Sequence, residues 1–365
     1  MEGCKIPLLH YSITPTFDKT MNLKRVAIIG ASGYSGEELV RLLLHHPHAE
    51  LVAVTSRQNA GQTLAQVFPK FASHPKSKTL RFTEPNAGLL AKQAEVVLLA
   101  LPHGVAAEYA VPLLDAGCLV IDLSADFRLK SPEIYREFYA HDHPAPDLLA
   151  SSVYGLPEIY REQIKKASLV ASPGCYPTSI LLPLIPLLRA GLVKPTGIIA
   201  DSLSGVSGAG RKAEADYLFC ECNESVRPYG LPKHRHLSEI EEQLSLAADT
   251  KVVVQFTPHL IPVNRGILTT LYLEPAGKLT EENISACYVK AYGREPFVRL
   301  LEGKALPDTK NVVGTNVIEI AWRLDPRTGR LVVMSAEDNL VKGASGQAVQ
   351  SLNLLCGWPE TAGLA

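Results

Sequence analysis

The stretch VAIIGASGYSGEELVRLL, residues 26–43, joins an apolar run to a helix-like pattern through three glycines. The run RVAIIG (25–30) predicts a strand buried on both faces, and GEELVRLLLHH (36–46) predicts an amphipathic helix. Further apolar runs lie at 50–56, 95–102 and 118–124, with a helical pattern at 105–117 between the last two. Apolar strands alternating with helices are typical of a parallel sheet covered on both faces. We therefore predict a doubly wound α/β fold for this half of the chain.

The second half changes to longer extended stretches, at 196–210, 251–262, 266–275 and 315–338. Helices are predicted near 236–247 and 280–292. Within the last stretch, DPRTG (325–329) lies between two alternating runs and predicts the turn of an antiparallel hairpin. Strands followed by helices and strands again predict an α+β second domain. The final segment, 343–357, returns to helical spacing.

A chain of 365 residues is long enough for two hydrophobic cores. We expect an N-terminal tail at 1–21, whose role the sequence does not indicate. A Rossmann-type domain is expected from 22–174 and 339–365, and an α+β domain that also carries the oligomer contacts from 175–338. The long extended stretches would expose strand edges or an apolar sheet face, so we expect a homodimer or homotetramer.

Composition argues against several classes of protein. The 36 basic and 37 acidic residues leave a net charge of −1, whereas nucleic-acid binders usually carry a basic excess. The most apolar run, ILLPLIPLL (180–188), is interrupted by Pro183 and Pro186 and is much shorter than the roughly 20 residues of a membrane span. The seven cysteines are scattered and odd in number, which favours a reducing compartment. We expect a soluble cytoplasmic protein.

Gly30, Gly33 and Gly36 lie at the end of the predicted strand, in the loop and at the start of the predicted helix. Glycines in this context let backbone amides approach a pyrophosphate at a helix N-terminus. The spacing is G-x-x-G-x-x-G instead of the G-x-G-x-x-G fingerprint, so the alternative is a merely tight β–α turn. We predict a dinucleotide site.

The end of the second predicted strand indicates which dinucleotide binds. NAD sites usually carry an acidic residue there, but this strand ends in Thr55, Ser56 and Arg57. A hydroxyl followed by a guanidinium suits a 2′-phosphate. We predict NADP(H), with Ser56 and Arg57 at that phosphate; the alternative is that Arg57 is a solvated loop charge.

Cys175 lies in SPGCYPTS (172–179), where Pro173 and Gly174 predict a sharp turn. Pro177 suits the first turn of a following helix, since its missing N–H costs nothing there. This places Cys175 at a helix N-terminus, whose dipole is expected to lower the thiol pKa and favour a nucleophilic thiolate. Free cysteines are otherwise usually small buried apolar residues. We favour that interpretation for the other scattered cysteines, which are Cys4, Cys118, Cys287 and Cys356.

A proton partner for the thiol is predicted at His234 and His236. In an extended segment both imidazoles would point to one side, with Arg235 turned away. A zinc site made of these histidines with Cys220 and Cys222 is the competing hypothesis. Both pairs are more tightly spaced than is usual for structural zinc ligands, so we predict no metal.

From about Arg25 to Trp358, the sequence resembles the N-acetyl-γ-glutamyl-phosphate reductases, arginine-biosynthetic relatives of aspartate-semialdehyde dehydrogenase. The motifs that carry the resemblance are GASGYSGEEL (30–39), ALPHG (100–104), DLSADFRL (122–129), VYGLPE (153–158), SPGCYPT (172–178), SGVSGAGR (204–211), KHRH (233–236) and DNLVKGASGQAVQ (338–350).

The resemblance implies NADPH-dependent reduction of N-acetyl-L-glutamyl 5-phosphate to the 5-semialdehyde, with release of inorganic phosphate. It implies a thioester on Cys175 and acid/base chemistry at His234, with Arg235 and His236 nearby. The implied NADP(H) contacts are Gly30, Ser32, Gly33, Tyr34, Ser35, Gly36, Ser56, Arg57, Ser207, Gly208 and Asn339. Asn339 and the segment 343–346 are expected to close over the nicotinamide.

Phosphate and carboxylate groups of such a substrate call for cationic or amide-rich loops. Arg128, Arg211 and the glycine-rich 204–210 are the candidates; either arginine could instead form an inter-strand ion pair. The alternative functions are an aspartyl-phosphate reductase and a carrier-bound α-aminoadipyl-phosphate reductase. An NADP-binding regulatory protein is the non-enzyme alternative, because a fold does not determine function.

Overall fold

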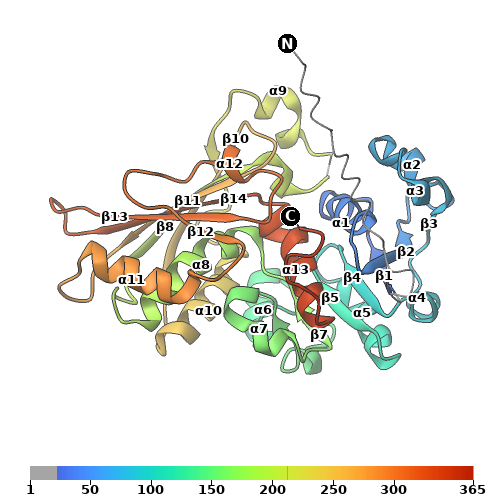
Figure 1. The fold of residues 1–365 in the computed structure, drawn as a ribbon, viewed down its shortest axis with the longest axis horizontal. Helices are drawn as coiled ribbons and strands as arrows, with labels where there is room; N and C mark the ends of the chain where they lie inside the picture. The colour runs from blue at the N-terminus through green and yellow to red at the C-terminus, as the bar shows by residue number, and fades with distance from the viewer. Residues whose placement is uncertain (1–22, 212, 365) are drawn as a thin grey trace, which may run out of the picture.

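The computed structural model describes residues 23–211 and 213–364, which form two seven-stranded sheets side by side (Figure 1). The predicted tail, 1–21, lies outside the described residues. The first sheet has the strand order β3-β2-β1-β4-β5-β7-β6, and all its pairs are parallel. Its strands are β1 (Lys24–Ile29), β2 (Ala49–Thr55), β3 (Phe82–Thr83), β4 (Val96–Leu99), β5 (Leu119–Asp122), β6 (Val153–Tyr154) and β7 (Leu169–Ala171). The predicted doubly wound α/β fold is confirmed.

Helices cover both faces of this parallel sheet. They are α1 (Tyr34–Leu44), α2 (Leu64–Val67), α3 (Pro75–Thr79), α4 (Ala87–Gln93), α5 (Ala106–Asp115), α6 (Pro132–Tyr139), α7 (Pro157–Ile164) and α13 (Gly346–Leu355). In β1, Val26 and Ile28 join the core that includes α1 and α13, whereas Ala27 and Ile29 join the core that includes α4 and α5. Burial on both faces explains why the strand has no polar alternation.

The second sheet is mixed and has the order β12-β13-β14-β11-β8-β10-β9. Its strands are β8 (Ile198–Gly205), β9 (Arg227–Pro228), β10 (Val254–Ile261), β11 (Ile267–Leu273), β12 (Val298–Leu300), β13 (Ile318–Leu324) and β14 (Leu331–Glu337). β13 and β14 form the predicted antiparallel hairpin, in which Leu324 pairs with Leu331. Figure 1 shows α8 (Cys175–Arg189), α10 (Leu237–Ala248) and α11 (Glu281–Tyr292) along one face. The predicted α+β organisation is confirmed.

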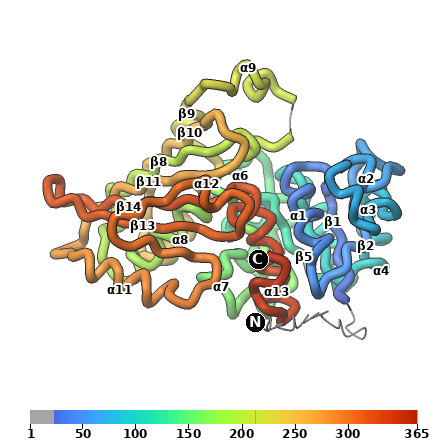
Figure 2. The backbone as a smooth tube through the Cα atoms, turned by 45° about the horizontal axis from the view of Figure 1, so that its top comes forward, coloured from blue at the N-terminus to red at the C-terminus, as the bar shows by residue number. Residues whose placement is uncertain are grey.

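Short helical segments complete the chain. They are α9 (Phe219–Cys222), α12 (Thr309–Val312), a π-helix at Val341–Ser345, and 3₁₀ turns at Pro69–Phe71, Pro146–Leu148, Val206–Ala209 and Ala215–Tyr217. After the hairpin the chain returns through the π-helix to α13, which contacts both α1 and α7 (Figure 2). The final helix therefore belongs to the core of the parallel sheet. No described helix combines the length and apolar character needed to cross a membrane.

The helix α8 continues through Pro183 and Pro186, which the sequence suggested as interruptions. Each proline removes the N–H that would bond the carbonyl four residues earlier. Side chains replace both lost donors: the Ser335 hydroxyl donates to the Ser179 carbonyl at 2.7 Å, and the Tyr292 hydroxyl donates to the Leu182 carbonyl at 2.6 Å. The mixed sheet and α11 thus hold α8 helical and fix its first residue, Cys175.

Candidate active site

Cys175 is the first residue of α8, as predicted, and follows β7 at the carboxyl edge of the parallel sheet. Gly174 is the N-cap of the helix, and a Cβ atom there would lie 2.6 Å from Nε2 of His236. Gly343 is equally confined, because its Cβ would lie 2.8 Å from Cβ of Cys175. Glycine at these two positions lets the His236 ring approach the cysteine loop and lets the backbone of the π-helix approach Cys175.

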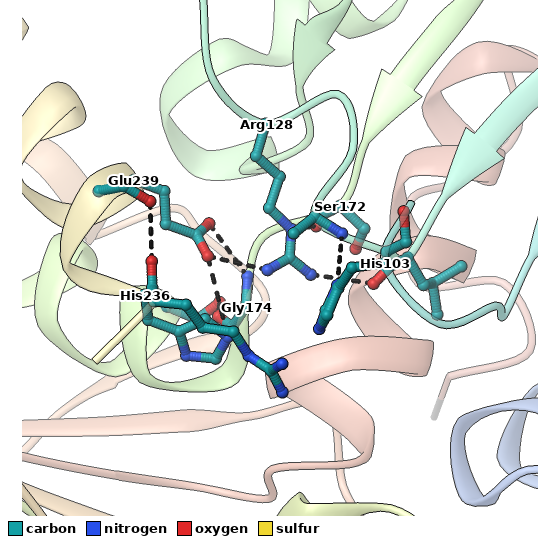
Figure 3. A network of polar contacts seen from close by, with 12 residues as sticks. His103, Arg128, Ser172, Gly174, His236 and Glu239 are labelled. Atoms are coloured by element: carbon teal, nitrogen blue, oxygen red, sulfur yellow. Dashed lines mark hydrogen bonds and ion pairs between the residues drawn. The ribbon is translucent and has the colours of Figure 1, made fainter. Parts of the chain in front are cut away.

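A buried carboxylate, Glu239 of α10, anchors the loop that carries Cys175 (Figure 3). Glu239 accepts hydrogen bonds from Nη1 of Arg128 at 2.8 Å, the Tyr154 hydroxyl at 2.8 Å and the Gly174 amide at 3.2 Å. Arg128 donates further to the Ser172 carbonyl at 2.8 Å. Two residues of the cysteine loop are therefore held by one buried ion pair.

The surroundings of Cys175 correct the expectation of a lowered thiol pKa. Burial, followed by the neighbouring Glu337, raises the pKa of Cys175 to about 12, although the residue keeps some exposed surface. The Tyr176 amide acts in the opposite direction, as expected of a helix N-terminus, but it is the weaker influence. The thiol is therefore protonated at neutral pH, and attack on a substrate requires a group that removes this proton.

His234 and His236 lie next to each other, with ring centroids 4.9 Å apart, at the start of α10. The predicted extended segment is wrong: the backbone turns here, and Nδ1 of His234 accepts the amide proton of His236 at 3.1 Å. Burial lowers the pKa of His234 to about 4 and that of His236 well below its ordinary value. Both imidazoles are therefore neutral at neutral pH, and Nδ1 of His236 has no hydrogen-bond partner. Arg235 is exposed, as expected.

The glycine loop is built for a close backbone approach. Gly30 has φ +83°, and a Cβ there would lie 2.3 Å from the Ala100 carbonyl oxygen. A Cβ on Gly36 would lie 2.4 Å from the Gly30 carbonyl oxygen. Gly33 is the N-cap of α1, so the first amides of the helix follow directly. These positions fit the approach of a pyrophosphate to the helix N-terminus.

The residues predicted at the 2′-phosphate lie beside this loop. The hydroxyls of Ser32 and Ser56 are 2.9 Å apart, so the segments that follow β1 and β2 form one small polar cluster. Arg57 is exposed, with Nη2 3.3 Å from the Tyr109 hydroxyl of α5.

The second predicted group of cofactor residues approaches from the mixed sheet. Asn339 donates to the Ser207 hydroxyl at 2.9 Å and accepts from the Gly266 amide at 2.8 Å. The adjoining π-helix reaches the glycine loop, where the Ser345 hydroxyl donates to the Ser35 carbonyl at 2.9 Å. Residues from both halves of the chain therefore meet at the N-terminus of α1.

The remaining arginine candidate lies at the cofactor loop. Arg211 forms an ion pair with Glu37 in the first turn of α1, and its guanidinium lies 4.7 Å from the Tyr34 ring centroid. Arg128 is buried against Glu239, as described above. Both arginines are thus ion-paired within the protein, although neither pair joins two strands.

The cysteines of the zinc alternative lie on α9, and its histidines lie at the start of α10. Within 23–211 and 213–364 there is no group of three His, Cys, Asp or Glu residues placed to hold a metal ion. Cys220 is exposed on α9, and Sγ of Cys222 lies 3.2 Å from the Asp216 carbonyl oxygen.

Three residues of the site were not identified from the sequence: Tyr154, Glu239 and Glu337. Glu239 follows the two histidines by helical spacing, Tyr154 lies in the VYGLPE motif without a role assigned to it, and Glu337 carries no pattern of its own. Each acts through a contact with a distant segment, so local sequence could not identify it.

Two family models match the chain. They are the semialdehyde dehydrogenase NAD binding domain, over residues 25–167, and the semialdehyde dehydrogenase dimerisation domain, over 175–339. Together they cover the strands of both sheets except β7, which lies between the two matched ranges, and the first residue of β1.

Curated relatives share much of the sequence. A protein of Akkermansia muciniphila is 57% identical over 345 residues, covering 94% of this chain and 99% of the relative. Proteins of Desulfotalea psychrophila and Moorella thermoacetica are each 50% identical, covering 93% of this chain and 97% of the relative. All three are named N-acetyl-gamma-glutamyl-phosphate reductase.

Solved structures share the fold at low identity. Aspartate semialdehyde dehydrogenase II of Vibrio cholerae has a TM-score of 0.70 at 19% identity, covering 92% of this chain and 99% of that chain. Aspartate semialdehyde dehydrogenase of Candida albicans with NADP has a TM-score of 0.66 at 16% identity, covering 92% and 99% of the two chains. The likeness establishes the architecture.

Proposed function

The chain belongs to the N-acetyl-gamma-glutamyl-phosphate reductase family, and from this premise we propose that Cys175 is its catalytic nucleophile. The protein is an NADP-dependent oxidoreductase of arginine biosynthesis. It reduces N-acetyl-L-glutamyl 5-phosphate to N-acetyl-L-glutamate 5-semialdehyde and releases inorganic phosphate. The observation that carries the assignment of Cys175 is its place at the start of α8, on a loop anchored by Glu239 beside two neutral histidines.

The first half of the reaction forms a thioester. An imidazole of the His234–His236 pair takes the proton of the Cys175 thiol, and the sulfur bonds to the acyl carbon. The carbon–oxygen bond to phosphate breaks, phosphate leaves with the electron pair, and the imidazolium passes its proton to it. A thiol of pKa about 12 makes such a base necessary.

The second half reduces the thioester and frees the cysteine. NADPH supplies a hydride when bound. The oxyanion that results re-forms the carbonyl, the carbon–sulfur bond breaks, and the electron pair returns to the sulfur of Cys175. The same imidazole passes a proton from solvent to that sulfur, which restores the thiol.

The histidine that moves the proton is one of two candidates. His236 faces Gly174 in the cysteine loop, whereas His234 accepts the His236 amide proton at Nδ1, so its neutral ring carries a proton on Nε2 that it can donate. We propose that the two imidazoles act together. One exchanges the proton with Cys175, and the other orients the first imidazole.

For the substrate's anionic groups we propose four residues: Arg128, Arg211, Arg235 and His236. Arg235 is exposed beside the imidazole pair, which suits a direct contact with phosphate or carboxylate. Arg128 supports the site through the buried pair with Glu239, and Arg211 approaches from the cofactor loop.

For NADP(H), we propose Gly30, Gly33 and Gly36 at the pyrophosphate, together with the neighbouring loop residues Ser32, Tyr34 and Ser35. Ser56 and Arg57 are proposed at the 2′-phosphate. The proposed contacts near the nicotinamide are Ser207, Gly208, Asn339 and 343–346. On this division, 22–174 and 339–365 supply most of the cofactor site, and 175–338 carries catalysis and oligomer contacts and adds Ser207 and Gly208 to the nicotinamide end.

The function is tested by phosphate-dependent reduction of NADP⁺ with N-acetylglutamate semialdehyde, with aspartate semialdehyde in parallel. We expect turnover with the first substrate only. Cys175→Ser should lower turnover by about 10³-fold or more while NADPH binding, followed by fluorescence, is retained. Cys356→Ser, at the C-terminal end of α13, is the matched control and should retain turnover. Near-normal turnover in Cys175→Ser would remove this residue from the mechanism, and turnover only with aspartate semialdehyde would favour the aspartyl alternative.

The cofactor assignment is tested by Arg57→Glu. Removing the guanidinium and adding a carboxylate beside the 2′-phosphate should raise KM for NADPH by about 10–100-fold while KM for NADH changes little. Arg327→Glu, at the tip of the β13–β14 hairpin, is the control for adding the same charge at an exposed position. An unchanged NADPH-to-NADH preference in Arg57→Glu would show that Arg57 does not bind the 2′-phosphate.

We also propose a homodimer or homotetramer in the cytoplasm. The face of the mixed sheet opposite α8 is partly exposed. Beside Asp201 and Thr270 it carries a group of apolar side chains, which are Leu203, Leu268, Tyr272, Val332 and Met334. A second copy of the chain would cover it. The six described cysteines are unpaired, which suits a reducing compartment. A monomer in light scattering at micromolar concentration would contradict the oligomer.

A further inference from the structure

Glu337, the last residue of β14, is a buried acid for which the mechanism above has no use. The residue has no exposed surface, and neither carboxylate oxygen has a hydrogen-bond partner in the structure. A buried carboxyl without partners is unfavourable, especially when ionised. We therefore looked to the neighbours of Glu337 for the reason that an acid is buried here.

The side chain of Glu337 points toward the start of α8. Alternation along β14 places it on the same face as Ser335, whose hydroxyl bonds the Ser179 carbonyl of α8. A Cβ on Gly343 would be 2.9 Å from Oε1 of Glu337 and 2.8 Å from Cβ of Cys175. Glu337 and Cys175 therefore lie on the same side of Gly343 and face each other across the space that a side chain there would fill.

The other charged groups around Glu337 are Lys342, Asp338 and Glu158. Lys342 is the cation among them, but its Nζ donates to Glu158 at 2.6 Å and to Gln350 at 2.9 Å. Its charge is thus already matched by Glu158. Burial raises the pKa of Glu337 well above its ordinary value, in keeping with a carboxyl that lacks a cation of its own.

Cys175 itself faces further groups, which set the background to any effect of Glu337. Arg128 favours its thiolate and Glu239 opposes it, while the phenols of Tyr176 and Tyr229 lie close enough to interact with it. Arg128 and Glu239 form a pair and largely offset each other. Glu337 has no such counter-charge, so its ionisation is felt by the thiol.

We propose that Glu337 and Cys175 form a coupled acid pair that carries at most one negative charge, so that Glu337 limits the thiolate at Cys175 outside the catalytic cycle. This inference rests on the proposed role of Cys175, and Glu337 acts through the cysteine without contacting substrate. A carboxylate at Glu337 and a thiolate at Cys175 would repel each other strongly in this buried space, so the two groups titrate as a unit. Because alkylating agents and peroxides react with thiolates, the pair also protects the cysteine from them.

The test is the pH dependence of Cys175 alkylation by iodoacetamide, located by mass spectrometry in the full-length protein. Glu337→Gln keeps the shape of the side chain but cannot ionise. A like charge at this range shifts a pKa by about 1–3 units, so the alkylation midpoint should fall by at least about one pH unit. Well below the midpoint, the rate at fixed pH should rise by about tenfold or more, and inactivation by hydrogen peroxide should accelerate in parallel.

Glu319→Gln is the matched control, because it removes the charge of another buried carboxylate of the mixed sheet, one that bonds Arg299. Its alkylation midpoint should equal that of the unsubstituted protein. Glu337→Met, which also cannot ionise and needs no hydrogen-bond partner, should repeat the downward shift and serves if the Gln variant does not fold. An unchanged or raised midpoint in both Glu337 variants would overturn the inference. Alkylation does not require turnover, so this outcome is distinguishable from failure of the proposed catalytic role.

Discussion

At the residue scale, Cys175 shows how a local preference is outweighed by its surroundings. The helix start supplies an amide that favours the thiolate, as expected from the sequence. Burial and Glu337 act more strongly in the other direction, so the thiol keeps its proton. The helix N-terminus alone therefore does not produce a thiolate at Cys175. On the proposed mechanism, a neighbouring base must take the proton.

The two buried histidines of the site predict how the free energy of unfolding depends on pH. The pKa of His234 is about 4 in the folded protein and about 6.5 when unfolded, so between these values the unfolded chain binds a proton that the folded chain does not. The stabilisation of the folded protein by neutral His234 is complete above about pH 6.5. As the pH falls toward 4, the free energy of unfolding decreases by up to about 3 kcal/mol. His236 acts in the same direction. Urea unfolding at pH 7.5 and 5 should show the loss.

The variant His234→Asn should reduce this pH dependence, because the site then has one titrating imidazole fewer. His45→Asn, at the exposed end of α1, is the control. An equal pH dependence in His234→Asn and the unsubstituted protein would show that His234 is not a source of the acid sensitivity.

At the element scale, the connection from β1 to α1 is a structure that only certain residues permit. Gly30 requires a positive φ, and Gly36 packs against the backbone of the loop that precedes it. The helix then begins at Tyr34 with its amides available. The glycine spacing, which differs from the usual fingerprint, still produces the close approach that a dinucleotide site needs.

Gly36→Ala should disrupt this connection. The new Cβ would lie 2.4 Å from the Gly30 carbonyl oxygen and 2.6 Å from Cα of Ala31, both backbone atoms that cannot rotate away. We expect a loss of about 1–3 kcal/mol of unfolding free energy and at least tenfold weaker NADPH binding. Thermal unfolding and fluorescence titration measure the two effects.

Gly88→Ala in α4 provides the comparison, since its nearest atom would be 3.6 Å away. Alanine is the better helix former, so that variant should gain about 0.5–1 kcal/mol and bind NADPH normally. Normal NADPH affinity in Gly36→Ala would mean that the loop does not require glycine at this position.

At the scale of the whole molecule, buried ion pairs join segments that are far apart in the sequence. Lys342 of the π-helix and Glu158 of α7 are both fully buried, 2.6 Å apart. Arg265, between β10 and β11, donates to Glu38 of α1 at 2.8 Å. The second contact links the mixed sheet to the helix of the glycine loop, so the proposed cofactor and catalytic residues keep a defined relative position.

Lys342→Met should destabilise the protein by about 3–5 kcal/mol, because it leaves Glu158 buried without its cation. The double variant Lys342→Met/Glu158→Leu should recover most of this loss, since it removes both charges. Guanidinium unfolding of the two variants measures the difference. If the double variant were no more stable than Lys342→Met, the unpaired charge could not be the cause.

The sequence by itself determined the elements and their class. Apolar runs without alternation predicted the parallel strands, because such strands are buried on both faces. The DPRTG turn predicted the hairpin, and the Pro-Gly pair predicted a helix start at Cys175. These are local properties, set by backbone conformation and side-chain spacing within one segment.

Only the tertiary structure decided the chemistry at the cysteine. Glu239, Tyr154 and Glu337 reach the start of α8 from distant segments, and α8 itself depends on Ser335 and Tyr292 to continue through its prolines. The proton affinity of Cys175 depends on burial and on charges brought near it by folding. Desolvation and Coulomb interactions follow distances in space, and the order of residues along the chain does not reveal those distances.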